Sequence, residues 1–144
     1  MSSIFKRIFS KLTYTSWHLG FVNGGLDGVF CDDELDISWV KDPLAKKRWF
    51  ADPFILDVTE DKIFLLVEEV RKTDPKGRIT RLTINRHNLT IEKADPIIET
   101  SYHLSFPNIL RKGEDIFIYP FADGSLIHLV DYDKLLGVNV TNFR

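Results

Sequence analysis

The sequence predicts an all-β fold, and three observations lead to that prediction. Aromatic residues make up 12% of the 144 residues, and Ile, Val and Thr are also frequent, which favours strands. From residue 49 onward, short apolar runs follow one another, and each is bounded by a turn signal. One of these stretches recurs after about 54 residues, which is in the range of a four-stranded repeat unit.

Composition limits the class of protein. The length suits a single domain, and 19 Lys and Arg against 21 Asp and Glu give a net charge of -2, so no nucleic-acid partner is expected. The single cysteine, Cys31, excludes an intramolecular disulfide and a multi-cysteine metal site. No apolar run approaches the ~20 residues that span a bilayer. Basic residues are interleaved with apolar ones at the amino terminus, unlike a secretory signal, so a cytoplasmic location is expected.

Residues 1–15 are predicted to form a short amphipathic helix. Apolar residues recur there at helical spacing with basic residues between them: Ile4, Phe5, Ile8, Phe9 and Leu12, with Lys6, Arg7 and Lys11. Two interpretations are open. The helix packs on its own domain or frays, or it makes a weak contact with a membrane or a partner, because so few cations and apolar residues bind lipid only weakly.

Residues 16–144 are predicted to form the β domain. Its strands are expected at residues 52–58, 62–70, 77–86, 89–94, 108–112, 115–121, 125–133 and 135–143. The run at 62–70 is continuously apolar, which predicts a central strand covered on both faces. The run at 77–86 alternates apolar and polar residues, which predicts a half-buried antiparallel strand.

The internal repeat predicts two propeller-like blades, at about 50–98 and about 104–144. Asp52-Pro53-Phe54-Ile55-Leu56 aligns with Phe106-Pro107-Asn108-Ile109-Leu110, and the acidic turn and apolar strand that follow also align. A propeller normally has at least four blades, so two blades predict either self-association or missing carboxyl-terminal blades. We expect an apolar face left without a neighbouring blade, lined by Phe64, Leu66, Ile116 and Ile118.

Four short motifs resemble a known family: Trp49 to Phe54, Leu66 to Glu69, Lys76 to Ile79, and Tyr102 to Pro107. They are similar to the five-bladed propeller domain at the amino terminus of glucosamine inositol phosphorylceramide transferases and related bacterial proteins, whose wider class includes glycoside hydrolase family 43. The resemblance implies a partial family-43-like β-propeller of about two four-stranded blades. It also implies a glycoside-hydrolase-like domain that acts on, or binds, the sugar of a glycan or glycolipid headgroup.

Asp52 is the catalytic residue that this resemblance implies, because in family 43 an Asp in an Asp-Pro context is the base. The following Pro53 favours an extended backbone at Asp52, and the first strand of a blade lies innermost, so the carboxylate would face the central funnel. The alternative is an Asp that caps a turn at the start of the strand.

Four further residues are candidates for sugar binding. Glu68 and Glu69 should point to opposite faces of their strand, with Glu68 toward the funnel; the alternatives for Glu68 are a solvated strand end and an ion pair with Arg71. The other three candidates are His103, Trp49 and Asp123. The alternative role of His103 is to tie a loop to the backbone, that of Trp49 is packing between blades, and that of Asp123 is a turn residue.

The sequence lacks a complete pair of catalytic carboxyl groups. Glycoside hydrolysis needs an acid and a base, but the repeat counterpart of Asp52 is Phe106, and no Glu lies in the run from Ile118 to Phe121. Three interpretations stay open: an enzyme, a non-catalytic binding or scaffolding module, and a truncated remnant of a larger glycan-processing protein. His103 has no second ligand at metal spacing, and no phosphate loop is present, so neither metal nor cofactor is expected.

Overall fold

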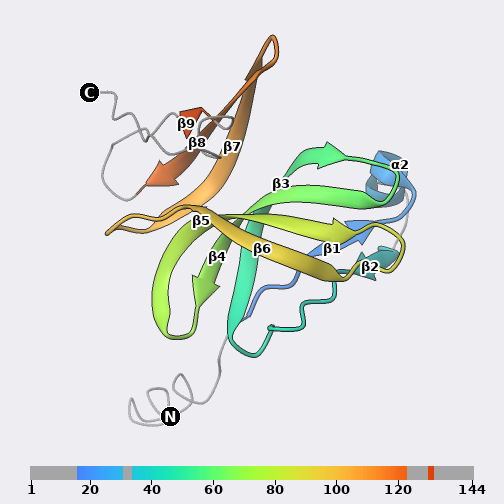
Figure 1. The fold of residues 1–144 in the computed structure, drawn as a ribbon. Helices are drawn as coiled ribbons and strands as arrows, with labels where there is room; N and C mark the ends of the chain where they lie inside the picture. The colour runs from blue at the N-terminus through green and yellow to red at the C-terminus, as the bar shows by residue number, and fades with distance from the viewer. Residues whose placement is uncertain (1–15, 31–33, 123–129, 132–144) are drawn as a thin grey trace, which may run out of the picture.

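The computed structural model describes residues 16–30, 34–122 and 130–131, and these are built mainly of antiparallel strands (Figure 1). A small sheet pairs β1 (Gly20–Val22) with β2 (Ile37–Trp39), and the short helix α2 (Gly25–Phe30) lies between them in the chain. The all-β prediction is confirmed. The helix predicted at residues 1–15 lies outside the described residues. No helix in the described part of the chain is long and apolar enough to cross a membrane.

The main sheet is a four-stranded antiparallel meander. Its strands, in spatial and chain order, are β3 (Arg48–Val58), β4 (Lys62–Arg71), β5 (Asp74–Asn85) and β6 (Ile91–Ile98). A second sheet follows, of β7 (Leu104–Lys112), β8 (Asp115–Ala122) and β9 (Val130–Asp131). Figure 1 shows the main sheet between the β1–β2 pair and the second sheet. The strand predicted at 135–143 lies outside the described residues.

The main sheet is covered on both faces. On one face, Leu65, Val67 and Leu82 pack with Leu19 and with the flank of the small sheet. On the other face, a second core forms against β7 and β8, and it includes Leu56, Leu66, Ile79, Ile98, Leu104 and Ile118. The prediction that residues 62–70 form a central strand covered on both faces is therefore confirmed. The half-buried strand predicted at 77–86 is wrong over residues 77–80, all of which are buried, because β5 is also a central strand.

The prediction of an open apolar face is also wrong for the four residues that were expected to line it. Leu66 and Ile118 are fully buried in the second core, and Phe64 and Ile116 pack against it. The reason is that the second sheet lies against the first, so each covers the other. The opposite face of β8 is the open one, since Tyr119 and Phe121 are 36% and 62% exposed.

The two X-Pro steps of the repeat share an unusual backbone. The β3–β4 register shifts between Ala51 and Phe54, and the β7–β8 register shifts between Ser105 and Asn108. Within these shifts, Asp52 has φ 48° and Phe106 has φ 46°. The extended backbone predicted for Asp52 is therefore wrong, because a β-bulge at this point places the residue in the left-handed region.

Candidate functional site

Three of the predicted site residues meet at one end of the main sheet. Asp52 lies near the start of β3, Glu68 near the end of β4, and His103 immediately before β7. Glu68 pairs across the strands with Ala51, the neighbour of Asp52. The carboxyl groups of Glu68 and Asp52 are hydrogen-bonded, and Oε1 of Glu68 lies 3.1 Å from Nε2 of His103. Glu68 is thus held between the other two side chains.

The histidine ring has a defined orientation. Nδ1 of His103 accepts a hydrogen bond from the backbone N–H of Gly77 at 2.9 Å. In the neutral ring the proton must then lie on Nε2, which donates to Glu68. The backbone tie that was considered as the alternative role of His103 is present, and its side chain nevertheless remains 38% exposed.

The protonation of Glu68 is unusual for a carboxyl group. The pKa of Glu68 is raised from 4.5 to about 7, chiefly by burial and in addition by the hydrogen bond and the negative charge of Asp52. Its side chain is only 7% exposed. Near neutral pH, Glu68 therefore exchanges a proton readily and can either donate or accept a hydrogen bond.

Asp52 also joins the two sheets. Its Oδ2 accepts a hydrogen bond from the backbone N–H of Phe106 at 3.3 Å. The left-handed conformation is costly for a bulky residue such as Phe106, so this bond stabilises the second bulge. Asp52 therefore fixes the backbone of a bulge in a strand 54 residues further along the chain.

Gly77 completes the cluster, whereas sequence reasoning placed it only at the start of the strand predicted at 77–86 and in the motif Lys76 to Ile79. A side chain at this position would overlap the carbonyl oxygen of Leu104 and would come within 2.9 Å of both Glu68 Oε1 and His103 Cε1. Only glycine lets the backbone N–H approach the histidine this closely. The sequence around Gly77 gives no sign of this approach, because His103 is 26 residues away.

The remaining predicted residues lie elsewhere. Trp49 lines a small hollow with residues of the amino-terminal segment and the 40–48 region, among them Trp17, His18 and Asp42, and none of Asp52, Glu68 and His103 lines it. Asp123 lies outside the described residues.

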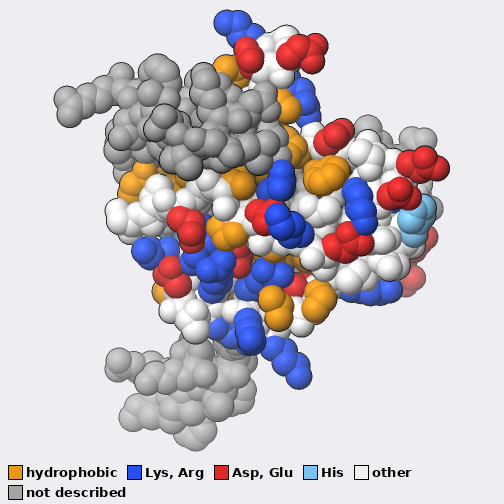
Figure 2. Space-filling model, viewed as in Figure 1, with side chains coloured by type: hydrophobic (Ala, Val, Ile, Leu, Met, Phe, Trp, Pro, Cys, Tyr) orange, Lys and Arg blue, Asp and Glu red, His pale blue; other side chains and the backbone are white. Residues whose placement is uncertain are grey.

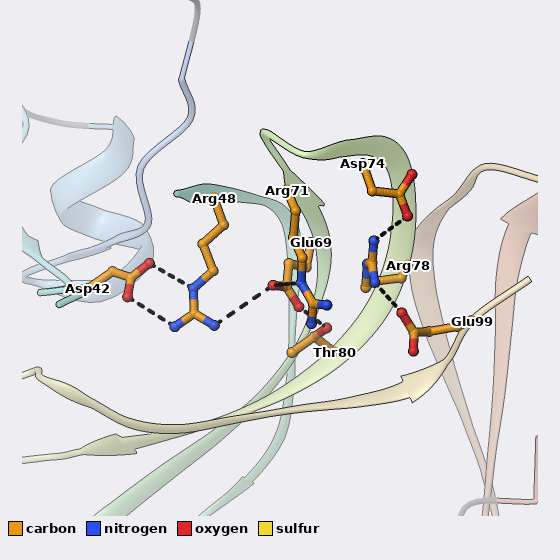
Figure 3. A network of polar contacts seen from close by, with 8 residues as sticks. All are labelled: Asp42, Arg48, Glu69, Arg71, Asp74, Arg78, Thr80 and Glu99. Carbon is orange, nitrogen blue, oxygen red and sulfur yellow. Dashed lines mark hydrogen bonds and ion pairs between the residues drawn. The ribbon is translucent and has the colours of Figure 1, made fainter. Parts of the chain in front are cut away.

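Glu69 points to the opposite face of β4 from Glu68, where it is fully buried among basic groups (Figure 3). Its Oε1 accepts from Nε of Arg71 at 2.9 Å and lies 3.8 Å from Nη1 of Arg48. Its Oε2 accepts from the hydroxyl of Thr80 at 2.7 Å. Asp42 binds the other edge of the Arg48 guanidinium. The ion pair with Arg71, considered for Glu68, is made by Glu69.

The geometry limits the chemistry of the Asp52–Glu68 pair. Two carboxyl groups of a glycosidase lie roughly 5 to 9.5 Å apart, on either side of the scissile bond. Asp52 and Glu68 are hydrogen-bonded to each other, so they lie closer together than either of these arrangements requires. Within the described residues, no group of three side chains is placed to hold a metal ion.

Comparison with known proteins adds no further constraint: the chain matches no family model, no curated protein and no solved structure.

Proposed function

We propose that this chain is a β-propeller-type module that binds a saccharide at the cluster of Asp52, Glu68 and His103. The observation that carries the proposal is the buried Glu68 carboxyl, held between a second carboxyl and an oriented imidazole. Asp52 and Glu68 offer hydrogen-bond donors and acceptors at one point, as sugar hydroxyl groups require, and His103, whose two ring nitrogens are already bonded, orients Glu68. The partly exposed ring of His103 gives a ligand access to the cluster.

We propose further that the two sheets are consecutive blades. They stack face to face through one shared core, and their first strands carry matched bulges at Asp52 and Phe106. The exposed aromatic face of β8 is where a further blade, or a second copy of the chain, would pack.

Binding without hydrolysis fits the cluster better than catalysis does. Two carboxyl groups in contact approach a ligand from the same side, whereas a glycosidic oxygen would need an acid on the opposite side from the base. The described residues place no third carboxyl group in the cluster with Asp52 and Glu68.

A scaffolding role without a ligand is the second candidate, and one observation favours it. Asp52 bonds the backbone of Phe106, and His103 bonds the backbone of Gly77, so both side chains also fix the two sheets to each other. In that case the cluster would serve the fold of a larger protein whose chemistry lies elsewhere.

Calorimetric titration with a panel of mono- and oligosaccharides separates the two candidates. We expect weak binding by the wild type and weaker binding by Asp52→Asn. Asp57→Asn is the matched control, since among the described residues this exposed carboxylate on the same strand bonds only the next backbone N–H. Equal binding by wild type and Asp52→Asn would remove Asp52 from the site and leave the scaffolding role.

An aryl-glycoside turnover assay on the same proteins tests the absence of catalysis. We expect no turnover. Turnover that disappears in Asp52→Asn would contradict the proposal and would assign Glu68 as an acid.

The imidazole is tested separately with His103→Ala, which should reduce saccharide binding. The control is His87→Ala, a histidine that is exposed in the β5–β6 turn and paired with Asp61. Binding that survives His103→Ala in a folded protein would exclude the imidazole from the site.

A further inference from the structure

A second, basic hollow lies on the Glu69 face of the same end of the main sheet. Its volume is about 540 Å³, and the cations that line it are Lys46, Lys47, Arg48, Arg71 and Lys72. Glu69 is the single carboxylate among its lining residues, which gives a net formal charge of +4 on a chain whose total is -2. Figure 2 shows Lys and Arg side chains gathered toward this lower end of the molecule. A positive hollow of this kind attracts anions.

The backbone holds the two basic segments side by side. The N–H of Lys72, just after β4, donates to the carbonyl oxygen of Lys47, just before β3, at 2.9 Å. The pairing of the backbone therefore places Lys46 and Lys47 opposite the Arg71–Lys72 segment. The two basic segments lie close together whatever conformations their side chains adopt.

Two acidic side chains, Asp42 and Glu69, hold the guanidinium groups of Arg48 and Arg71 in place. Arg48 is bound by Asp42 and lies near Glu69, while Nε of Arg71 donates to Glu69. The hydrogen bond to Glu69 raises the pKa of Arg71, so the guanidinium stays charged. Among the described residues, no hydrogen bond uses the two terminal nitrogens of Arg71, whose side chain is 39% exposed. A guanidinium held in this way is suited to a bidentate contact with an oxyanion.

The carboxylates near the hollow do not cancel its charge. Glu69 and Asp42 together balance the two arginines, and Asp74 and Glu99, the other acids near Arg71, both bind Arg78 instead (Figure 3). Lys46 and Lys47 are in excess of the charge that the buried acids require. A structural ion-pair network would need no such excess.

We infer that this hollow binds a phosphate group, with Arg71 as the bidentate contact and Lys46 and Lys47 as charge partners. The phosphate could belong to a soluble phosphate ester or to a phospholipid headgroup, which present the same oxyanion to the site. This inference is independent of saccharide binding, because Glu68 and Glu69 face opposite sides of β4.

The test uses two probes and one pair of matched variants. Titration with inorganic pyrophosphate measures soluble phosphate, and co-flotation with phosphatidylcholine vesicles, with and without phosphatidic acid, measures the headgroup. The double variant Lys46→Gln/Lys47→Gln removes two charges from the hollow, and Lys93→Gln/Lys112→Gln removes the same charge from exposed positions elsewhere. We expect the first to weaken binding about tenfold and the second to leave it within about twofold.

Each outcome bears on the inference. Binding of pyrophosphate, lost in the first variant only, supports a soluble ligand; capture by phosphatidic acid vesicles alone, lost in the same variant, supports a headgroup. No binding of either probe, or equal loss in both variants, overturns the inference. Saccharide titration of Lys46→Gln/Lys47→Gln should be unchanged, so failure here is distinguishable from failure of the proposed saccharide site.

Discussion

Glu68 and Glu69 are adjacent residues of one type on one strand, yet the structure gives them opposite electrostatic surroundings. Glu68 faces the carboxyl of Asp52 and the imidazole of His103, and its pKa is raised to about 7. Glu69 faces Arg48 and Arg71 and accepts a hydrogen bond from the hydroxyl of Thr80. The alternation of a β-strand is sufficient to separate a proton-exchanging carboxyl from a permanently paired one.

The largest expected effect is loss of the charge on Glu69. In Glu69→Gln, Arg48 and Arg71 lose their buried counter-ion, so we expect the free energy of unfolding to fall by about 3 kcal/mol. In Glu68→Gln at pH 8, a buried charge beside Asp52 is removed, so we expect no loss or a small gain. Urea denaturation of both variants measures the contrast; equal destabilisation would show that the two surroundings do not differ as described.

Gly77→Ala should disturb the packing around Glu68 and leave the surroundings of Glu69 unchanged. The added methyl group would overlap the carbonyl oxygen of Leu104 and crowd both Glu68 and His103. We expect a loss of about 2 kcal/mol in unfolding free energy, as for other overpacked sites. Gly113→Ala is a control for a glycine whose Cβ would meet no atom within 4 Å, although its positive φ adds a strain of its own. A loss no larger than in that control would contradict the close packing at Gly77.

The pH dependence of stability should report Glu68. Folding raises its pKa from 4.5 to about 7, so the folded state binds the proton more tightly. The stabilisation is complete below about pH 4.5 and is lost as the pH rises through about 7. Asp74 and Asp95, whose pKa values are lowered on folding, act in the opposite sense at lower pH. Thermal unfolding between pH 5 and 8 should show the fall in the wild type and a flatter profile in Glu68→Gln.

The smallest expected effect is that of Asp52→Asn on Glu68. The asparagine removes the negative charge that raises the pKa of Glu68, and its amide can donate to the ionised carboxyl, so this pKa should fall. Burial still acts, so the pKa should remain above 4.5. Carbon NMR of the Glu68 carboxyl in both proteins measures the shift; an unchanged titration would show that burial alone sets it.

The sequence allowed the prediction of most strands and of the opposite orientations of Glu68 and Glu69, because period-two patterning records which face of a strand is covered. It also placed Asp52 and Phe106 at equivalent positions of the repeat. It did not reveal the left-handed backbone at Asp52, since a bulge depends on the neighbouring strand as well as on the local X-Pro step.

Long-range contacts account for the other differences. The pairing of Glu69 with Arg48 and the approach of Gly77 to His103 join residues 21 and 26 positions apart, and no local motif encodes them. Trp49 was grouped with Asp52 because the two are close in sequence. Its side chain instead lines the hollow beside Trp17 and His18.

The hydrogen bond from the Phe106 backbone to Asp52 has a consequence for the order of folding. It closes a loop of 54 residues that contains the whole of β4, β5 and β6, whereas the hairpins of the main sheet close short loops. Because distant contacts cost more chain entropy to form, this bond should arise after the transition state. Asp52→Asn should therefore leave the refolding rate almost unchanged and should speed unfolding. The Asp52 carboxylate would then join the two sheets only late in folding.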